Sequence, residues 1–512
     1  MNASAGISKP KEQKIVWWIC LAAAAHVFVF AAAFPVFNQL DEGCHFDLVV
    51  RYSHGQLPRG LQPMDREASL YLLTYGSPEF KGLAKNFPDG RFPAPPWMET
   101  TTNQLAWRNA AFVRAAADWE IDKKLPFWTN YETSQPPLYY TLAGLWWRVG
   151  QWLGFAGLGL VYWLRFLNVI FVAALVWIGH GAAREIFPKQ KFFTLGVPVL
   201  IAFAPMQAFY SIQNDVLSPV CFGLAFVCLL RLWRAEIPGA WLGAATGLLL
   251  AAAFLTKLSN VPLLAVAGIF IILKICRLAR TGTWQRSLSA FIVLFFCAAL
   301  PTAVWLAWTK IAFGDFTGSA AKLRFITWTP KPFHEWWHHP IFTPSGLWTF
   351  ISQLTWTTWE GSLHWHSNLL TLPAVNAVYV ILTLSILTFA LLNLLMRGKP
   401  ATDFQRVALW LGFFCLTAGA GFLAYLSIIY DFGICQDPSR EHPYFAEGRL
   451  ILGAMVPGLL LYLYGLNYLL QGAKNNWAKP LVLGLIVLFM LVSEIATDWT
   501  VFASQYNWYH LP

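Results

Sequence analysis

The sequence has few charged residues, few cysteines, and no internal repeat or low-complexity segment. Only 12% of its 512 residues are Asp, Glu, Lys or Arg, whereas 57% are hydrophobic. Soluble globular chains carry roughly 25% charged residues, so an ordinary cytosolic enzyme is excluded, as are disordered and fibrous proteins. The eight cysteines form no CxxC pair, which excludes a disulfide scaffold and leaves no redox or zinc motif of that type.

What the sequence has instead is long apolar segments and many aromatic residues, including 27 Trp and 40 Phe. A membrane-crossing helix needs about 20 apolar residues, and Trp is enriched at membrane interfaces. Eleven segments predict an all-α polytopic membrane protein with about 11 transmembrane helices: 15–37, 161–183, 193–212, 216–233, 239–256, 259–273, 287–309, 371–396, 407–430, 450–470 and 480–497.

A twelfth apolar segment, 136–154, is short and carries Arg148 together with several Trp and Tyr residues. If it crossed the membrane, the Lys- and Arg-rich loops after it would lie outside, against the positive-inside rule. We therefore expect it to form an amphipathic helix in the outer interface. All short basic loops then fall on the cytoplasmic side, which holds 17 basic and four acidic residues.

This charge distribution predicts a cytoplasmic N-terminus and an outer C-terminus in the cytoplasmic (inner) membrane. The net charge of +10 is then a signal of orientation, and no nucleic-acid partner is expected. The first span is expected to remain as an uncleaved anchor. Most residues outside the spans lie in three outer segments, 38–160, 311–370 and 431–449, so we expect interfacial helices and the active site on the outer (periplasmic) face.

Polar residues avoid the centres of the predicted spans and gather at their outer ends. Secondary transporters bind substrates near the middle of the membrane, so this distribution favours an interfacial enzyme. Asp41, Glu42 and His45 follow the first span directly, and Asp41 and His45 would share one face of a helix. The motif QND at 213–215 stands at another outer junction. Helix capping is the alternative explanation for both acidic motifs.

Cations also stand at outer junctions, where the positive-inside rule disfavours them. Lys257 lies in the turn AFLTKLSN, and Arg449 lies in DPSREHPYFAEGRLILG together with Tyr444 and Glu447. Snorkelling or unspecific contact with lipid headgroups is the alternative for these cations. A guanidinium is nevertheless well suited to a lipid phosphate. Carboxylates beside such cations are what glycosyl transfer from a lipid phosphate requires.

No nucleotide sugar is expected outside the cytoplasmic membrane, so a transferase on that face needs a membrane-borne donor such as a polyprenyl-phosphate sugar. The departing phosphate needs positive charge where its negative charge grows. The incoming hydroxyl needs a general base within hydrogen-bond reach. One base and one phosphate clamp therefore suffice for transfer with inversion.

Five motifs follow one another along nearly the whole chain: Asp41-Glu42 after the first span, SQPPLYYTLAG at 134–144, QND at 213–215, FLTKLSN at 254–260 and PYFAEGRLILGAMVPGLLL at 443–461. In this order they resemble the GT-C superfamily of polyprenyl-phosphate-sugar-dependent membrane glycosyltransferases, nearest the protein O-mannosyltransferase and lipid A aminoarabinose transferase type. The resemblance implies one GT-C-type transmembrane domain over residues 1–512.

The resemblance also implies roles for individual residues. It assigns the base to Asp41, with Glu42 as its neighbour, and it maps a further carboxylate to Asp215. Lys257 and Arg449 match positions that face the donor phosphate. The full set of predicted substrate-binding residues is His45, Gln213, Asn214, Lys257, Arg449, Tyr444 and Glu447. Whether Asp41 or Glu42 is the base stays open.

The predicted function is an inverting glycosyltransferase that moves a monosaccharide from a polyprenyl-phosphate donor to a glycan, lipid or protein acceptor, as in building a cell-envelope polysaccharide. A transporter or flippase for a lipid-linked glycan, and a polymerase or ligase with a polyprenyl-diphosphate donor, are the alternatives. Gln-Pro-Pro at 135–137 and Gly43-Cys44-His45 depart from the family pattern. The sugar and the acceptor therefore stay open.

A divalent metal is possible but not required, because the segment 311–370 contains HEWWHHP and WEGSLHWHS. Histidine and carboxylate ligands suit several metals, yet their spacing matches no recognised motif, so a Trp-rich interfacial helix is the simpler interpretation. The possible ligands are His334, Glu335, His338, His339, Glu360, His364 and His366. Cys44 and Cys435 lie in outer segments and are either one disulfide or two free thiols.

Overall fold

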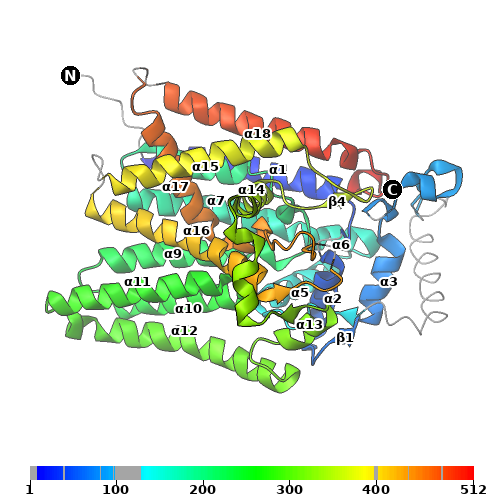
Figure 1. The fold of residues 1–512 in the computed structure, drawn as a ribbon, viewed down its shortest axis with the longest axis horizontal. Helices are drawn as coiled ribbons and strands as arrows, with labels where there is room; N and C mark the ends of the chain where they lie inside the picture. The colour runs from blue at the N-terminus through cyan, green and yellow to red at the C-terminus, as the bar shows by residue number, and fades with distance from the viewer. Residues whose placement is uncertain are drawn as a thin grey trace.

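The computed structural model describes residues 9–38, 41–80, 82–95, 97–98, 129–396, 402–435, 437–473, 475 and 477–511. Within these ranges the chain is mainly helical, and β structure is confined to three antiparallel pairs of two-residue strands. The predicted all-α class is therefore confirmed for the described part of the chain. Long helices run side by side along the long axis, and shorter elements gather toward one end of the bundle (Figure 1).

Nine helical segments in the described ranges are long and apolar enough to cross a membrane. Two shorter apolar helices, α8 (Lys191–Ala202) and α10 (Ala240–Thr256), accompany them. Each of the eleven coincides with one predicted span, so the multi-pass architecture is confirmed. The nine contain α1 (Lys9–Ala33), α6 (Gly157–Arg165) with α7 (Leu167–Ile186), α9 (Ser218–Arg234), α11 (Val261–Arg280), α12 (Trp284–Phe313), α15 (Pro373–Leu395), α16 (Asp403–Ile429), α17 (Met455–Leu469) and α18 (Ala478–Phe502).

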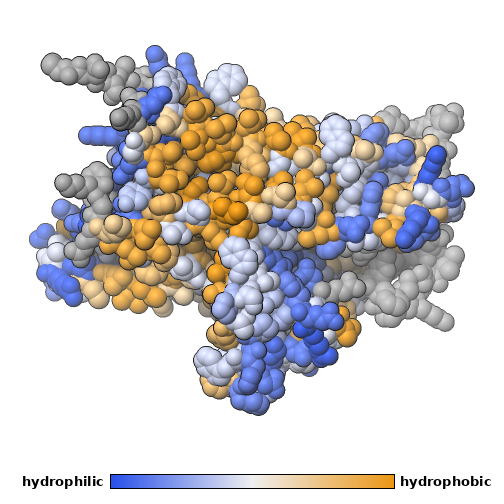
Figure 2. Space-filling model, turned by 45° about the horizontal axis from the view of Figure 1, so that its top comes forward, coloured by the Kyte–Doolittle hydropathy of each residue, from blue (hydrophilic) through white to orange (hydrophobic). Residues whose placement is uncertain are grey.

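The surface of the bundle agrees with this assignment. Figure 2 shows hydrophobic residues over the flanks of the long helices, with hydrophilic residues at both ends. Side chains that point outward from the helices include Leu300, Val304, Ile381 and Leu488, all of them exposed. An apolar zone of this kind on a helical bundle matches the hydrocarbon core of a bilayer.

The span predicted at 193–212 is helical only as far as Ala202, where α8 ends. Pro205 follows closely, and a residue that precedes proline disfavours the helical conformation. The chain continues in two short 3-10 helices, η5 (Gln207–Tyr210) and η6 (Asn214–Val216), whose residues are buried. Irregular backbone in a membrane protein is tolerated where it is enclosed by protein or lines a cavity.

Two glycines bring α10 and α12 into backbone contact. A Cβ atom on Gly243 or on Gly247 would collide with the backbone of α12 at Ala290 and Leu294. The spacing of four residues places both glycines on one face of α10, which is the close-packing arrangement common between membrane helices. Replacement of either glycine would push the two helices apart.

The end of the bundle that carries the site is built from short elements. These are α2 (Glu42–Ser53), α3 (Arg66–Tyr75), α5 (Leu138–Trp152), α13 (Ser319–Phe325), α14 (Pro344–Trp359), and the 3-10 helices η1 (Pro78–Phe80), η2 (Ala84–Asn86), η3 (Pro88–Gly90), η7 (Leu258–Asn260), η8 (Phe333–His338), η9 (Pro340–Phe342), η10 (Gly448–Ala454) and η11 (Trp508–His510). The segment predicted as an interfacial helix is α5, and it packs against α2 (Figure 1). Gly144 permits this, because a Cβ there would meet the backbone of Ser53.

Three strand pairs join segments of the same end. β1 (Gln62–Pro63) pairs with β2 (Thr129–Asn130), and β4 (His364–Trp365) pairs with β5 (Asn368–Leu369). β3 (Thr329–Pro330) pairs with β6 (Tyr430–Asp431), so segments about a hundred residues apart in the sequence are held together. The β3–β6 pair places the loop before η10 beside α13 and α14.

Candidate active site

One large cavity lies among these short elements. Its volume is about 1310 Å³, above the range of about 300–1,000 Å³ usual for small-molecule sites. Its wall is drawn from α2, the stretch between β2 and α5, α13, α14 and the residues around the start of η10. The Asp, Glu, Lys and Arg residues that line it in the described part of the chain are Asp41, Glu132, Lys257, Lys322, Asp437, Glu447 and Arg449.

Asp41 stands immediately before α2 with a left-handed backbone, at φ 63° and ψ 10°. Aspartate tolerates this conformation better than most residues. Its carboxylate does not cap α2 but lines the cavity, where it accepts hydrogen bonds from the Tyr131 hydroxyl and, at 3.2 Å, from Arg449 Nη2. Burial alone would raise the pKa of Asp41, but Arg449, Lys322 and the Tyr131 hydroxyl together lower this pKa below its usual value. Asp41 is therefore ionised at neutral pH.

Two cations beside Asp41 are held by a second carboxylate. Lys257 Nζ forms an ion pair with Asp215 Oδ1, and Arg449 Nη1 lies 3.8 Å from Asp215 Oδ2. Arg449 thus bridges Asp41 and Asp215. Its Nε–H is buried and has no hydrogen-bond partner among the described residues. The carboxylate oxygen nearest to this Nε is Glu447 Oε2, at 4.0 Å. A guanidinium that lines a cavity is suited to an oxygen of an anionic ligand.

The QND motif lies behind these cations. Asp215 and Gln213 are fully buried and do not line the cavity, whereas Asn214 does. Gln213 Oε1 accepts from Arg449 Nη1 at 3.4 Å, and the amide of Asn214 donates to Gln135 Oε1 at 3.2 Å and to the carbonyl of Thr256 at 3.0 Å. In this arrangement Asp215 and Gln213 position the cations.

Glu42 is turned away from the cavity, although the sequence suggested it as a neighbour of the base. Its carboxylate forms a paired contact with Arg165, at 2.7 Å and 2.8 Å from Nη2, and accepts from the backbone N–H groups of Asn38 and Ile212, each at 2.9 Å. Glu42 and Arg165 are both completely buried. The guanidinium also donates to the carbonyls of Ala31, Phe34 and Pro35 at the end of α1. Glu42 therefore fixes the chain around Asp41 from inside the protein.

The remaining predicted residues take different positions. His45 lines the cavity, its Nδ1 lies 2.7 Å from the Tyr140 hydroxyl, and burial lowers its pKa to about 4, so the ring is neutral at pH 7. Glu447 also lines the cavity and accepts from the Ser362 hydroxyl at 2.6 Å, and burial raises its pKa. Tyr444 does not line the cavity, because its ring packs into a separate apolar cluster with Ile341, Phe350, Leu354, Leu423 and Ala446.

The sequence did not predict an ion pair in the cavity wall between Glu132 and Lys322 of α13. Gln135 Nε2 donates to the other oxygen of Glu132 at 2.6 Å, and Lys322 is the main cause of the lowered pKa of Glu132, against the raising effect of burial. Glu132 stands two residues before the motif SQPPLYYTLAG, which was the signal that could have found it. Nothing local in the sequence distinguishes Lys322 from a solvated lysine.

The candidate metal ligands do not converge. Across the ranges that the structure describes, no group of three or more His, Cys, Asp or Glu residues is placed to hold a metal ion. His334 is exposed, His339 Nε2 lies 3.0 Å from the carbonyl of Pro443, and Glu360 contacts Thr371. Of the remaining candidates, Glu335 and His338 line a separate surface pocket and His364 lines the large cavity, while His366 packs on Trp365. Cys44 and Cys435 are both free thiols.

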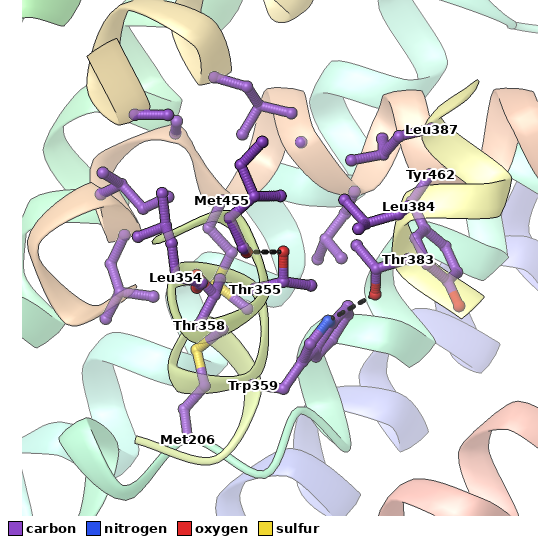
Figure 3. Close-up of a pocket in the computed structure, with 18 of the residues that line it drawn as sticks. Met206, Leu354, Thr355, Thr358, Trp359, Thr383, Leu384, Leu387, Met455 and Tyr462 are labelled. Atoms are coloured by element: carbon purple, nitrogen blue, oxygen red, sulfur yellow. Dashed lines mark hydrogen bonds between the residues drawn. The ribbon is translucent and has the colours of Figure 1, made fainter. Parts of the chain in front are cut away.

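An apolar pocket of about 230 Å³ lies beside the cavity, between α14, α15, α16 and α17. Figure 3 shows Leu354 and Thr358 of α14 on one side of it and Leu384 and Leu387 of α15 on the other. A small hollow of about 10 Å³ separates the two spaces. The hollow shares Met206, Thr358, Trp359 and Leu452 with the apolar pocket, and Ser362 and Arg449 with the cavity. The guanidinium of Arg449 thus stands where charged and apolar walls meet.

The sequence profile of a protein family described as "Predicted membrane protein (DUF2142)" matches residues 26–433. The chain belongs to this family. The match runs from the last third of α1 to the end of α16 and therefore covers most of the cavity wall, while Glu447 and Arg449 follow it in the sequence. Among curated proteins, no relative matches this member of the family.

Two solved structures of an archaeal oligosaccharyltransferase from Archaeoglobus fulgidus are similar to this chain. One, tethered with an acceptor peptide containing the NVT sequon, has a TM-score of 0.44 at 12% identity over 98% of this chain and 56% of that chain. The other, AglB in complex with an inhibitory peptide and a dolichol-phosphate, has a TM-score of 0.41 at 10% identity over 96% of this chain and 56% of that chain. This DUF2142 protein therefore spans about half the length of those chains.

Proposed function

We propose that this protein is an inverting glycosyltransferase of the GT-C type that transfers a monosaccharide from a polyprenyl-phosphate donor to an acceptor hydroxyl. The observation that carries this proposal is the position of Arg449, between a charged cavity and an apolar pocket. A ligand with its anionic head at Arg449 and its hydrocarbon tail against the neighbouring apolar surface matches this boundary. We further propose that the chain forms one domain, that its N-terminus is cytoplasmic, and that the cavity opens on the outer face.

Asp41 is the base in the proposed reaction. Its carboxylate takes the proton of the acceptor hydroxyl, and an electron pair of the acceptor oxygen forms the new bond to the anomeric carbon of the donor sugar. The bond between that carbon and the phosphate oxygen breaks, and its electron pair leaves with the polyprenyl phosphate. One displacement from the opposite side inverts the anomeric configuration. Arg449, Lys322 and the Tyr131 hydroxyl keep Asp41 ionised before the reaction.

Arg449 and Lys257 act on the leaving group. The phosphate gains negative charge as the glycosidic bond breaks, and fixed cations stabilise that charge in a water-poor site. Arg449 and Lys257 both line the cavity, and Asp215 holds both cations in place. The cavity volume of about 1310 Å³ leaves room for a sugar and an acceptor together.

The direct test is transfer by the purified protein in lipid nanodiscs. We expect a labelled sugar on polyprenyl monophosphate to appear in a glycosylated product, with release of polyprenyl phosphate. Transfer from the polyprenyl-diphosphate donor alone would identify a polymerase or ligase instead. Movement of the donor across the bilayer with no bond broken would identify a flippase, and either outcome would overturn the proposal.

Substitution of Arg449 measures the phosphate clamp. A charge-assisted hydrogen bond contributes about 1.5–3 kcal/mol, so Arg449→Gln is expected to weaken donor binding by about tenfold to a hundredfold. Arg449→Lys keeps the charge without the planar donor set and should restore binding only in part. Titration of a fluorescent polyprenyl-phosphate sugar measures the donor affinity of both variants.

Arg440→Gln is the matched control, because this exposed arginine pairs with Asp431 outside the cavity. Equal donor affinity in Arg449→Gln and wild type would contradict the clamp.

The pH dependence of transfer tests the environment of Asp41. The base form of Asp41 exists above its pKa and is lost as the pH falls through that value. The Tyr131 hydroxyl helps to lower this pKa, so Tyr131→Phe should raise it and move the acid limb of the rate profile to higher pH. The rate on the plateau above should change less. Tyr425→Phe, on an exposed face of α16, serves as the control. If the acid limb of Tyr131→Phe lies at the same pH as that of the wild type, Asp41 is not the group whose protonation limits the rate.

A further inference from the structure

The cavity has two chemically different ends. Asp41, Lys257 and Arg449 belong to the charged end, where Lys322 and Glu132 also form their ion pair. The other end is formed by α14 and by the loop between β6 and η10. Four residues of α14 line it, and they are called the α14 wall below: Thr349, Ser352, Gln353 and Trp356.

The α14 wall is one face of a helix. Its members are spaced by three, four and seven residues from the first, which places them in a row on a single side. The opposite side of α14 is apolar, and Phe350 and Leu354 are buried there in the cluster that also contains Tyr444. The cavity side therefore carries hydrogen-bonding groups and one aromatic ring, but no charge.

The wall is fixed relative to the phosphate clamp. The Thr357 hydroxyl donates to the carbonyl of Ala446 at 2.8 Å and accepts from the backbone N–H of Gly448 at 2.9 Å. A Cβ on Gly448 would collide with the backbone of Thr358, so the two segments touch. Arg449 follows directly, and so the distance from the wall to its guanidinium is set by backbone contact.

Aromatic rings and neutral polar groups both line this part of the cavity. Trp356 is half-buried in the wall, and Trp328 lines the cavity as well. Trp328 is held by Phe432 and Phe445, at centroid distances of 4.7 Å and 5.3 Å, and its Nε1–H points to Cys435 Sγ at 3.1 Å. In the wall, the Gln353 oxygen lies 2.7 Å from His442 Nε2, which leaves the amide N–H₂ group of Gln353 for a ligand.

We propose that the α14 wall is the acceptor subsite and that the acceptor is a neutral carbohydrate. The apolar face of a pyranose ring packs on an indole, and its hydroxyls exchange hydrogen bonds with amide and hydroxyl side chains. The Lys and Arg residues that line the cavity in the described ranges, Lys257, Lys322 and Arg449, are each paired with a carboxylate. Asp437 also lines the cavity, where the basic group that interacts with it is the imidazole of His364 and not a lysine or arginine. An acidic glycan would meet this carboxylate without a compensating cation.

This assignment rests on the proposed transferase, because it names the acceptor class of the same cavity. Its test uses binding, so that the two can fail separately. Cys435 is a free thiol at the carbohydrate end, beside Trp328, and Cys276 is an exposed thiol on α11, away from the cavity. Alkylation of both by a small maleimide, read out by mass spectrometry of each peptide, reports occupancy of the cavity with an internal reference.

We expect saturable protection of Cys435 by at least one neutral trisaccharide from a panel built of glucose, mannose, galactose and N-acetylglucosamine. Alkylation of Cys276 should be unchanged. Trp356→Ala and Gln353→Ala should each weaken protection at least tenfold, while Trp356→Phe should retain most of it. Trp348→Ala is the matched control, because this tryptophan of α14 is exposed and does not line the cavity. Thermal unfolding of every variant verifies that the fold is kept.

Three results would overturn the assignment: protection by none of the neutral sugars, protection only by a hexuronate oligosaccharide or a Ser/Thr peptide, or neutral-sugar protection that survives in Trp356→Ala and Gln353→Ala. The variant Asp41→Asn distinguishes the acceptor subsite from the proposed transferase reaction, because loss of the base should leave the protection of Cys435 by neutral sugars intact. If neutral sugars protect Cys435 and no polyprenyl-monophosphate sugar is consumed, the subsite stands and the proposed reaction fails.

Discussion

Asp41→Asn is expected to abolish sugar transfer while leaving the folded protein in the membrane. Amide and carboxylate have nearly the same shape, so the hydrogen bond from Tyr131 can persist. The amide has no proton affinity to offer, and loss of a positioned general base costs about 10²–10⁴-fold in rate. Transfer from the labelled donor, measured with the same amount of monodisperse protein, gives this ratio.

Glu67→Gln is the control for this variant. Glu67 pairs with His54 at 2.9 Å and does not line the cavity, so its neutralisation should leave the rate near that of the wild type. Donor binding to Asp41→Asn should be retained or strengthened, since Arg449 loses a competing anion. Wild-type turnover in Asp41→Asn would rule out the assigned role.

Glu42→Ala is expected to have the largest effect on stability. It leaves the buried guanidinium of Arg165 without its only carboxylate among the described residues, and it strips two backbone N–H groups of their acceptor. Breaking one side of a fully buried ion pair costs about 3–5 kcal/mol. We therefore expect little folded protein and a marked drop in the unfolding temperature in detergent. Fluorescence-detected gel filtration and a thermal ramp measure both.

The double variant Glu42→Leu with Arg165→Met makes this prediction specific. Replacing both charges by apolar side chains removes the uncompensated charge, and such replacements are often neutral. The double variant should therefore recover much of the stability lost in Glu42→Ala. Asp65→Ala, which removes a side-chain cap of α3, is a milder control at about 1 kcal/mol. If Glu42→Ala were as stable as wild type, the ion pair would not hold the segment before Asp41.

The long helices of the bundle could be predicted because each contains a long apolar run of the kind that crosses a membrane. Segment 136–154 could be treated correctly as something other than a span because Arg148 and the later basic loops argue against crossing; in the structure Arg148 Nε donates to the carbonyl of Ser53 at the end of α2. Local patterns thus determine most of the fold. The early end of α8 was missed although Pro205 was visible.

The candidate site could be predicted only in part. Asp41 stood out because it directly follows the first span, and Lys257 and Arg449 because the positive-inside rule disfavours cations at outer junctions. The structure brings the three residues together. The sequence could not predict that the side chain of Glu42 points away from the cavity, because this orientation depends on Arg165, which is more than a hundred residues away in the sequence. The α14 wall was not predicted, because only the folded structure shows that these residues line the cavity.

The contact of Arg449 Nη2 with Asp41 at 3.2 Å has a kinetic consequence. A carboxylate that shares a guanidinium is a weak proton acceptor, and it becomes a stronger one when a phosphate takes over that guanidinium. In the proposed reaction, binding of the donor phosphate to Arg449 therefore makes Asp41 a stronger base. This imposes an order of addition, with the lipid first and the hydroxyl second, and it leaves water in the vacant cavity facing a carboxylate that is not yet competent to deprotonate it.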